Sequence, residues 1–205
     1  MKAGHYLAFE GIEGAGKSSV AAAVAARLTA TRPVLTVREP GGTPLGEQIR
    51  QLVLHGTELS GWAEALLFAA ARAQLAASVI RPALAAGSWV VSDRSVYSSL
   101  AYQGIARGLG LPAVEAVNRA GLEGTWPDTV VLLRLSSLPE LAEGLSRQQV
   151  PDRIGAEGLT FQTAAAAGFD LLATAEPERF VVVEAGRPFD VVVKTVLELL
   201  ERRLG

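Results

Sequence analysis

A glycine-rich run near the amino terminus has the residue types and spacing that hold a phosphate. The run GIEGAGKS at residues 11–18 fits the pattern G-x-x-x-x-G-K-[ST] and lies between an apolar stretch and an alanine-rich one. Glycines let the backbone turn its N–H groups inward, and a following helix adds positive potential. A chance lysine in a glycine-rich turn is the alternative, which the full spacing disfavours. We predict an ATP·Mg²⁺ site formed by Gly11, Ile12, Glu13, Gly14, Ala15, Gly16, Lys17, Ser18 and Ser19.

An Asp-Arg pair after a later apolar run adds metal-binding and anion-binding groups. Asp93 closes the run WVVSD, where its carboxylate is expected to face the phosphate loop and, with Ser18, to bind Mg²⁺ or its waters. Arg94 follows directly and offers a planar pair of donors to an acceptor phosphate. A solvated salt bridge is the alternative for Arg94, and its place beside the strand end disfavours it.

The turn REPGGT at residues 38–43 is expected on the acceptor side of the site. Arg38 opens the turn, Glu39 and Pro40 form it, and Arg50 follows within the next predicted helix. Both arginines have the donor geometry that suits a phosphate, but a solvent-exposed salt bridge explains either of them equally well. We therefore treat these four residues as candidates for substrate binding.

A phenylalanine and an arginine one helical turn apart could hold a flat base. Phe68 and Arg72 are four residues apart, so both side chains project from one face of a helix. A base can stack on the ring while the guanidinium donates to a base carbonyl. Phe68 alone would more often be a core residue, because Leu66 and Leu67 accompany it. Arg72 one turn later favours the binding role.

Five short apolar segments must position these groups. Several of them, such as residues 130–133, are apolar on both faces, as parallel strands covered on both sides must be. Strands are predicted at residues 5–9, 33–38, 88–93, 128–135 and 179–185. The pattern predicts an α/β fold of the P-loop NTPase type, a doubly wound five-stranded parallel sheet with helices on both faces, in a single domain over residues 1–205.

Stretches with helical periodicity separate the strands. Helices are predicted at about residues 17–29, 44–54, 62–86, 95–106, 112–123, 138–147, 157–175 and 188–203, with boundaries set to within about three residues. Pro82 is expected to kink the longest of them, because proline lacks the N–H and its ring crowds the preceding turn. Gly87 is expected to end it as a capping residue.

The composition limits the partners. With 19 basic and 21 acidic residues among 205, the chain has a net charge of −2 and lacks the basic footprint of a nucleic-acid-binding protein. The absence of cysteine excludes disulfides and thiolate metal sites, and two histidines are too few for a histidine metal cluster. No signal peptide or basic amphipathic segment is visible, so we expect a soluble, cytoplasmic protein without a membrane partner.

A phosphate loop alone does not distinguish a kinase from a nucleotide-driven switch. A GTPase is disfavoured because no N-K-x-D run follows a strand in this sequence. Two functions stay open on these grounds, namely a monophosphate kinase for uridylate or adenylate, and an ATP-binding switch.

Five stretches together make the chain resemble bacterial thymidylate kinase over nearly its whole length. They are FEGIEGAGKSS at residues 9–19, REPGGT at 38–43, LLFAAARAQL at 66–75, DRSVYSSLAYQG at 93–104 and DRIGAEG at 152–158. The resemblance implies a P-loop nucleoside monophosphate kinase fold with ATP·Mg²⁺ as donor. It also implies dTMP as acceptor, dTDP as product and a homodimer.

The resemblance implies roles for individual residues. Residues that match Arg50 and Arg94 grip the monophosphate, and those that match Phe68 and Arg72 stack on thymine and contact its O4. The acid that matches Glu13 reaches the acceptor 3′-hydroxyl and the Mg²⁺ shell.

A second group, Ser99, Tyr102 and Gln103, matches the family's region that reads the base and closes on the deoxyribose. A tyrosine under C2′ would exclude a ribose hydroxyl, so we expect Tyr102 to select the deoxy sugar.

Positive charge around the transferring group is expected from a lid at about residues 146–157. The phosphate loop contains no arginine, and in the family such chains use lid arginines instead. Arg153 matches the family's D-R pair, and Arg147 aligns with it loosely. The family usually has an acid where this chain has Gly155, and whether Glu157 takes its place is left open. The catalytic candidates are Glu13, Lys17, Arg94, Arg147 and Arg153.

Overall fold

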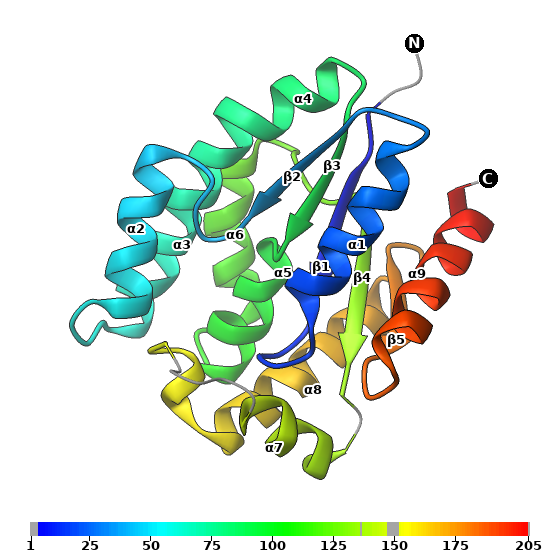
Figure 1. The fold of residues 1–205 in the computed structure, drawn as a ribbon. Helices are drawn as coiled ribbons and strands as arrows, with labels where there is room; N and C mark the ends of the chain where they lie inside the picture. Colours follow the sequence, from blue (N-terminus) through cyan, green and yellow to red (C-terminus); the bar gives the residue numbers. More distant parts are fainter. Residues whose placement is uncertain (1–3, 136, 147–151, 205) are drawn as a thin grey trace.

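Five parallel strands form one sheet at the centre of the molecule (Figure 1). The computed structural model describes residues 4–135, 137–146 and 152–204. The strands, in the spatial order β2-β3-β1-β4-β5, are β1 Tyr6–Glu10, β2 Val34–Arg38, β3 Trp89–Asp93, β4 Thr129–Arg134 and β5 Phe180–Glu184. Each lies within its predicted range or extends it by one residue, so the predicted five-stranded parallel sheet is confirmed.

The strand order changes direction at β1. From β1 the chain passes to β2 and β3 on one side, and then to β4 and β5 on the other. At such a switch point the loops that leave the carboxyl ends of the strands diverge and leave room for a ligand. The loops after β1, β2 and β3 contain the glycine-rich run, the EPGG turn and Arg94, so this topology gathers the predicted site.

The sequence forms strands here because the central segments are buried on both faces. All five residues of β1 are buried, as are the first five of β4. Apolar residues at successive positions satisfy both faces of a sheet covered by helices.

Helices surround the sheet at the predicted positions. They are α1 Lys17–Thr29, α2 Pro44–His55, α3 Gly61–Leu75, α4 Arg81–Ala85, α5 Val96–Ser99, α6 Leu111–Leu122, α7 Leu138–Ser146, α8 Leu159–Ala175 and α9 Phe189–Leu204. Helices α1 and α9 pack against each other on one face of the sheet, while α8 and the helix that follows α5 cover the other (Figure 1). Helix α2 packs outside α3, and α3 packs against α6.

Two of the predicted helices contain wider turns. A π-helical segment, η1 Ala76–Ile80, joins α3 to α4, and a second, η2 Leu100–Ala106, extends α5. Pro82 lies two residues after the end of η1, and the widened turn accommodates a ring that would crowd a regular α-helix. Gly87, with a φ of 80°, lies just beyond α4 as predicted.

The helix predicted from residue 157 starts later. A short 3₁₀ turn, η3 Gly155–Glu157, comes first, and α8 begins at Leu159. Gly158 between them has a φ of 84°, a left-handed conformation that interrupts a helix. The observed start is two residues later than predicted, within the margin of about three residues given to helix boundaries, because the helical periodicity does not register a single left-handed residue.

Candidate active site

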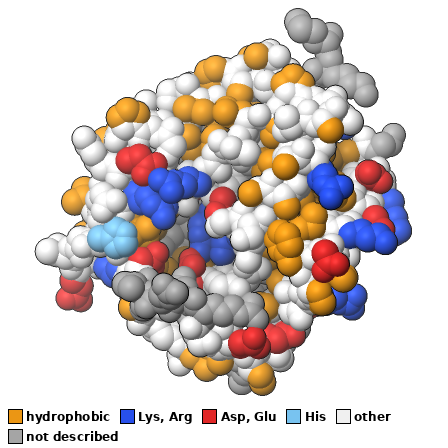
Figure 2. All heavy atoms as spheres, in the orientation of Figure 1, with side chains coloured by type: hydrophobic (Ala, Val, Ile, Leu, Met, Phe, Trp, Pro, Cys, Tyr) orange, Lys and Arg blue, Asp and Glu red, His pale blue; other side chains and the backbone are white. Residues whose placement is uncertain are grey.

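A cavity of about 310 Å³ opens at the carboxyl ends of the central strands. Figure 2 shows basic and acidic side chains gathered around a hollow in this face of the molecule. Predicted residues that line the cavity are Glu13, Lys17, Ser18, Arg38, Glu39, Pro40, Arg50, Phe68, Arg72, Asp93, Arg94, Ser99, Tyr102 and Gln103. The structure thus brings together groups that are up to ninety residues apart in the sequence.

The glycine-rich loop between β1 and α1 has the backbone that a phosphate cradle needs. Gly14 and Gly16 have φ values of 77° and 81°, which residues with a Cβ rarely adopt. Gly16 is the N-cap residue of α1, so the free N–H groups of the first helical turn lie at the loop. A side chain on Gly14 would also collide with the backbone of Gly144 in α7.

Lys17 lies across this loop with its ammonium group out of bulk water. Its Nζ donates to the main-chain oxygen of Ile12 at 2.7 Å, and the residue is 6% exposed. Burial, followed by repulsion from Arg94, lowers the pKa of Lys17 to about 8. Burial disfavours the ammonium charge of Lys17, and a phosphate ligand would stabilise that charge.

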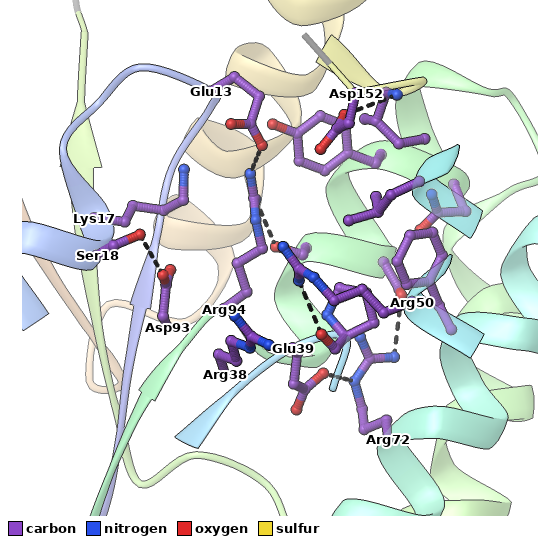
Figure 3. Close-up of a pocket in the computed structure, with 18 residues that line it drawn as sticks. Glu13, Lys17, Ser18, Arg38, Glu39, Arg50, Arg72, Asp93, Arg94 and Asp152 are labelled. Atoms are coloured by element: carbon purple, nitrogen blue, oxygen red, sulfur yellow. Dashed lines mark hydrogen bonds and ion pairs between the residues drawn. The ribbon is translucent and has the colours of Figure 1, made fainter. Parts of the chain in front are cut away.

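Ser18 and Asp93 form an oxygen-rich point beside Lys17 (Figure 3). The Ser18 hydroxyl donates to Oδ2 of Asp93 at 2.5 Å. The other carboxylate oxygen, Oδ1, is buried without a hydrogen-bond partner among the described residues. A buried oxygen without a donor fits a ligand that brings positive charge, and hydroxyl and carboxylate oxygens are the ligands that Mg²⁺ prefers. The residues therefore fit the predicted metal.

Arg94 connects the phosphate loop with the rest of the cavity. It has a φ of 72°, unusual for a residue with a Cβ, and this backbone directs its side chain toward the loop after β1. Its Nη2 pairs with Glu13, and its Nη1 donates to the Ser98 hydroxyl at 3.1 Å and more weakly to the Gly11 oxygen at 3.4 Å. Burial acts against its charge, but Glu13 and other acids prevail and raise the pKa of Arg94.

Arg38 and Arg50 approach the cavity from β2 and α2. Nη2 of Arg38 donates to both carboxylate oxygens of Glu47 at 3.1 and 2.9 Å, so the exposed salt bridge considered for this arginine is present. Arg50 donates to the Pro40 oxygen at 2.9 Å. Burial, and then the nearby Arg38, lower the pKa of Arg50. Figure 3 shows Arg50 and Arg94 reaching into the space between Lys17 and Arg72, so an anion there would meet both guanidinium groups.

Arg72 at the far end of the cavity is held from four sides. It is 3% exposed, and its Nε donates to Glu39 at 2.6 Å. Nη1 donates to the Ser99 hydroxyl at 3.0 Å and to Oδ1 of Asn118 at 2.5 Å, while Nη2 donates to the Ser95 oxygen at 3.1 Å. A guanidinium fixed in this way presents its remaining donor in one direction only.

Tyr102 forms part of the wall between these two ends. Its hydroxyl lies 3.3 Å from the Gln162 side-chain oxygen, and its ring packs edge-on against Phe169 with centroids 5.9 Å apart. Burial is the main reason why the pKa of Tyr102 is raised. The phenol is therefore neutral and rigidly placed.

Three buried polar residues that support the site were not predicted. Glu10 accepts from the hydroxyls of Ser95 and Ser98, both at 2.7 Å, and fixes the start of α5 next to Arg94. Asn118 holds Arg72, and Glu64 binds Gln103 at 2.8 Å. The sequence carried a signal for Asn118 and Glu64, because each is a polar residue with helical spacing to the apolar residues on the buried face of its helix.

Four further residues line the cavity without having been predicted, namely Leu54, Ser98, Asp152 and Ile154. Conversely, some predicted residues do not line it. Ile12 and Ala15 are buried in the core, so only their backbone groups can contact a nucleotide, and Ser19 is exposed on α1 outside the cavity lining. The predicted loop and lid residues outside the lining are Gly11, Ile12, Gly14, Ala15, Gly16, Ser19 and Arg153.

Of the two candidate lid arginines, the structure describes only Arg153. Arg153 is held by residues of α2 and α3, because its Nη2 pairs with Glu64 at 2.7 Å and its Nε donates to the Val53 oxygen at 2.9 Å. Arg147 lies outside the described residues. Glu157 pairs with Arg107, so the acid two residues after Gly155 does reach a basic partner.

Comparison with known proteins agrees with this geometry. Residues 9–196 match the family model described as thymidylate kinase. The chain is 45% identical over 192 residues to the thymidylate kinase of Deinococcus radiodurans, with 93% of each chain covered. It is 39% identical over 211 residues to that of Halalkalibacterium halodurans, with both chains covered completely. The chain thus belongs to the thymidylate kinase family, whose members use ATP to phosphorylate dTMP to dTDP.

Proposed function

We propose that this chain transfers the γ-phosphoryl group of ATP to dTMP through the residues of the cavity described above. The observation that carries the proposal is that one cavity has Lys17 and the Ser18–Asp93 pair at one end and Arg72 at the other (Figure 3), and that Phe68, one turn before Arg72 on α3, also lines it. Donor phosphates at the first end and a base at the second leave the acceptor phosphate between them, beside Arg50 and Arg94. This is the order that in-line transfer requires.

Each residue has a role that follows from its position. Lys17 and the loop amides bind the donor phosphates, and Arg94 and Arg50 orient the acceptor phosphate. Its oxygen attacks the γ-phosphorus while the bond to the ADP oxygen breaks. No general base is needed, because the attacking oxygen is already anionic at neutral pH. Glu13, which pairs with Arg94, restrains that arginine from the loop side.

Ser18 and Asp93 would hold Mg²⁺ or its waters. When bound, the ion neutralises charge on the donor phosphates. The unpartnered Oδ1 of Asp93 supports this assignment.

At the acceptor end, Phe68 would stack on the base and Arg72 would donate to a base carbonyl. Ser99, which accepts from Arg72, and Gln103, which lines the same cavity, would complete the pocket for the base edge. Tyr102 would lie against the deoxyribose, where its fixed ring leaves no room for a 2′-hydroxyl. Glu39 supports this end by binding Arg72, and Pro40 supports the position of the acceptor phosphate by binding Arg50.

We further propose one domain with a lid at about residues 146–157, acting as a homodimer in the cytoplasm. Exposed Leu45 and Leu52 of α2 and Trp62 and Leu66 of α3 offer an apolar surface for a second subunit. By length and composition alone, the described helix Gly61–Ala85 could span a membrane. It carries the buried Arg72 and packs against α2 and α6, which supports a place in a globular core and not in a bilayer. The acidic net charge supports the absence of a nucleic-acid partner.

The test is a coupled assay that measures ADP formation from ATP with each of dTMP, dUMP, UMP, AMP and dGMP. We expect the highest kcat/KM for dTMP, and no ADP above background with Lys17→Met prepared in the same way. Preference for UMP or AMP would instead indicate a different monophosphate kinase. ADP formation that does not depend on any acceptor would indicate an ATP-binding switch.

A further inference from the structure

Glu64 is a buried carboxylate that joins two parts of the candidate site. It lies in the first turn of α3 and is fully buried. We propose that Glu64 is a positioning residue that orients Gln103 for recognition of the base and anchors the end of the lid segment through Arg153. This inference rests on the proposed transfer to dTMP, and it adds a residue that does not line the cavity.

Two side chains donate to the Glu64 carboxylate, and a third forms an ion pair with it. Nε2 of Gln103 donates to Oε1 at 2.8 Å, and Arg107 donates to Oε1 at 3.3 Å and to Oε2 at 3.1 Å. Nη2 of Arg153 lies 2.7 Å from Oε2. Gln103 lies in η2 and Arg107 directly follows it, whereas Arg153 lies before η3. One carboxylate therefore connects elements that are far apart in the chain.

The contact with Glu64 fixes which end of the Gln103 amide is available to a ligand. A carboxylate can only accept, so Gln103 must turn its NH₂ group toward Glu64. The carbonyl oxygen is then the end left for the cavity, which Gln103 lines. Without the carboxylate, the amide could rotate by half a turn and present a donor in place of an acceptor.

This orientation complements that of Arg72 two turns further along α3. Glu64, Phe68 and Arg72 are spaced by four residues and share one helix face. Arg72 has one N–H of Nη2 without a partner among the described residues, so that end of the pocket offers a donor. A donor from Arg72 and an acceptor from Gln103 in the same cavity match the carbonyl and N–H on one edge of thymine. Cytosine presents an amino group and an unprotonated ring nitrogen there, and would place donor against donor and acceptor against acceptor.

The second half of the proposal concerns residues 152–157. The N–H of Arg153 donates to the Leu54 oxygen at 3.0 Å and its Nε to the Val53 oxygen at 2.9 Å, at the end of α2. Arg107, which also binds Glu64, pairs with Glu157. Glu64 therefore lies at the centre of a network that holds this segment next to the helix bearing Phe68 and Arg72.

The test substitutes the carboxylate with its neutral isostere. For Glu64→Gln we expect the ratio of kcat/KM for dTMP to that for dCMP to fall about tenfold, as expected when one hydrogen bond to a substrate is misaligned. We also expect faster amide hydrogen exchange in a peptide covering residues 152–157, with unchanged exchange in α9. Glu115→Gln, which removes an exposed carboxylate paired with Arg119, is the matched control and should change neither measurement.

A double-mutant cycle identifies the path through Gln103. If Glu64 acts through that amide, Glu64→Gln combined with Gln103→Ala loses no more dTMP preference than Gln103→Ala alone. Glu64→Asp keeps the charge but shortens the reach, so it gives a smaller loss of preference and serves if Glu64→Gln does not fold. An unchanged dTMP preference in either folded variant, additive losses in the cycle, or unchanged exchange at residues 152–157 would each overturn the proposal. Failure of the wild-type protein to phosphorylate dTMP would instead overturn the proposed function.

Discussion

The hydroxyl of Ser18 donates to Oδ2 of Asp93 at 2.5 Å, and this contact joins the first turn of α1 to the end of β3. The two residues are 75 positions apart, and parallel pairing of β1 with β3 brings them together. Phe9 is in register with Asp93, so the loop that follows β1 starts beside that carboxylate. The contact places an oxygen pair next to Lys17, where donor phosphates are expected.

Asp93→Asn tests the metal assignment. We expect the Mg²⁺ concentration for half-maximal activity to rise about 10- to 100-fold, because an amide is a weaker metal ligand than a carboxylate. The measurement is a Mg²⁺ titration of initial rate at saturating ATP and dTMP. Glu198→Gln on the surface of α9 is the control and should titrate like the wild type. A titration curve for Asp93→Asn identical to the wild type would show that this carboxylate has no part in metal binding.

The lowered pKa of Lys17 predicts a pH dependence of ATP binding. In the free protein Lys17 loses its proton near pH 8, whereas bound phosphates favour the charged form. ATP affinity should therefore fall as the pH rises above about 8, with proton uptake on binding at about pH 9. Calorimetry in two buffers with different ionisation enthalpies measures that uptake. Lys17→Met should show none, and a wild-type protein without uptake would contradict the prediction.

The same pKa has a consequence for folding. Between about pH 8 and the ordinary lysine value of 10.5, the unfolded chain binds more protons at this position than the folded one. The contribution of Lys17 to the free energy of unfolding therefore increases as the pH rises through this window. It remains at its least favourable below about pH 8, where the buried lysine is charged.

Asn118 should control base recognition through Arg72. Asn118→Leu removes the oxygen that accepts from Nη1 of Arg72 and leaves that buried N–H unpaired. We expect the KM for dTMP to rise about tenfold with a smaller change in kcat. Asn118→Asp keeps an acceptor at the same place and should bring the KM back to within about threefold of the wild type. Equal KM values for the two variants would contradict this role.

Tyr102→Ala tests selection of the deoxy sugar. The ring is held by Phe169 and Gln162, so its removal opens space at the side of the cavity. We expect the preference for dTMP over its ribose analogue, ribothymidine monophosphate, to fall at least about tenfold in kcat/KM. Tyr102→Phe keeps the ring and should keep most of the preference. An unchanged preference in Tyr102→Ala would remove the steric explanation.

The lid arginines are separated by comparing Arg147→Ala with Arg153→Ala. An arginine aimed at the transition state contributes about 10³- to 10⁵-fold to kcat. Because Arg153 is bound to Glu64 and Val53, we expect its loss to lower kcat much less than the loss of Arg147. Single-turnover rates with ATP and dTMP measure this. If each substitution lowers kcat less than about tenfold, lid arginines do not supply the transition-state charge.

Much of the fold was predictable because the strands are short and several of them are apolar on both faces. Their parallel arrangement followed from the helices between them, and α1 has the predicted bounds. The π-helical turns were not predicted, because periodicity over 62–86 and 95–106 does not distinguish a regular turn from a widened one. The late start of α8 depends on the φ of Gly158 alone.

The residues that face the cavity were predictable where a motif gives each one a chemical role. The residues that hold these side chains in place were harder to predict, because the role of a buried carboxylate such as Glu10 or Glu64 is evident only from the donors around it. Those donors, among them Ser98 and Gln103, come from other elements. The direction of Arg153 also depends on tertiary contacts with α2 and α3, which the lid sequence does not contain.

The most direct test of the proposed transfer from ATP to dTMP is to identify the product of the reaction. The purified protein is incubated with dTMP and ATP labelled at the γ-phosphate, and nucleotides are separated by chromatography. We expect label in the β-phosphate of dTDP, one dTDP for each ADP, and no product with Lys17→Met. Label found only in inorganic phosphate, or no labelled dTDP at any Mg²⁺ concentration, would contradict the proposed transfer.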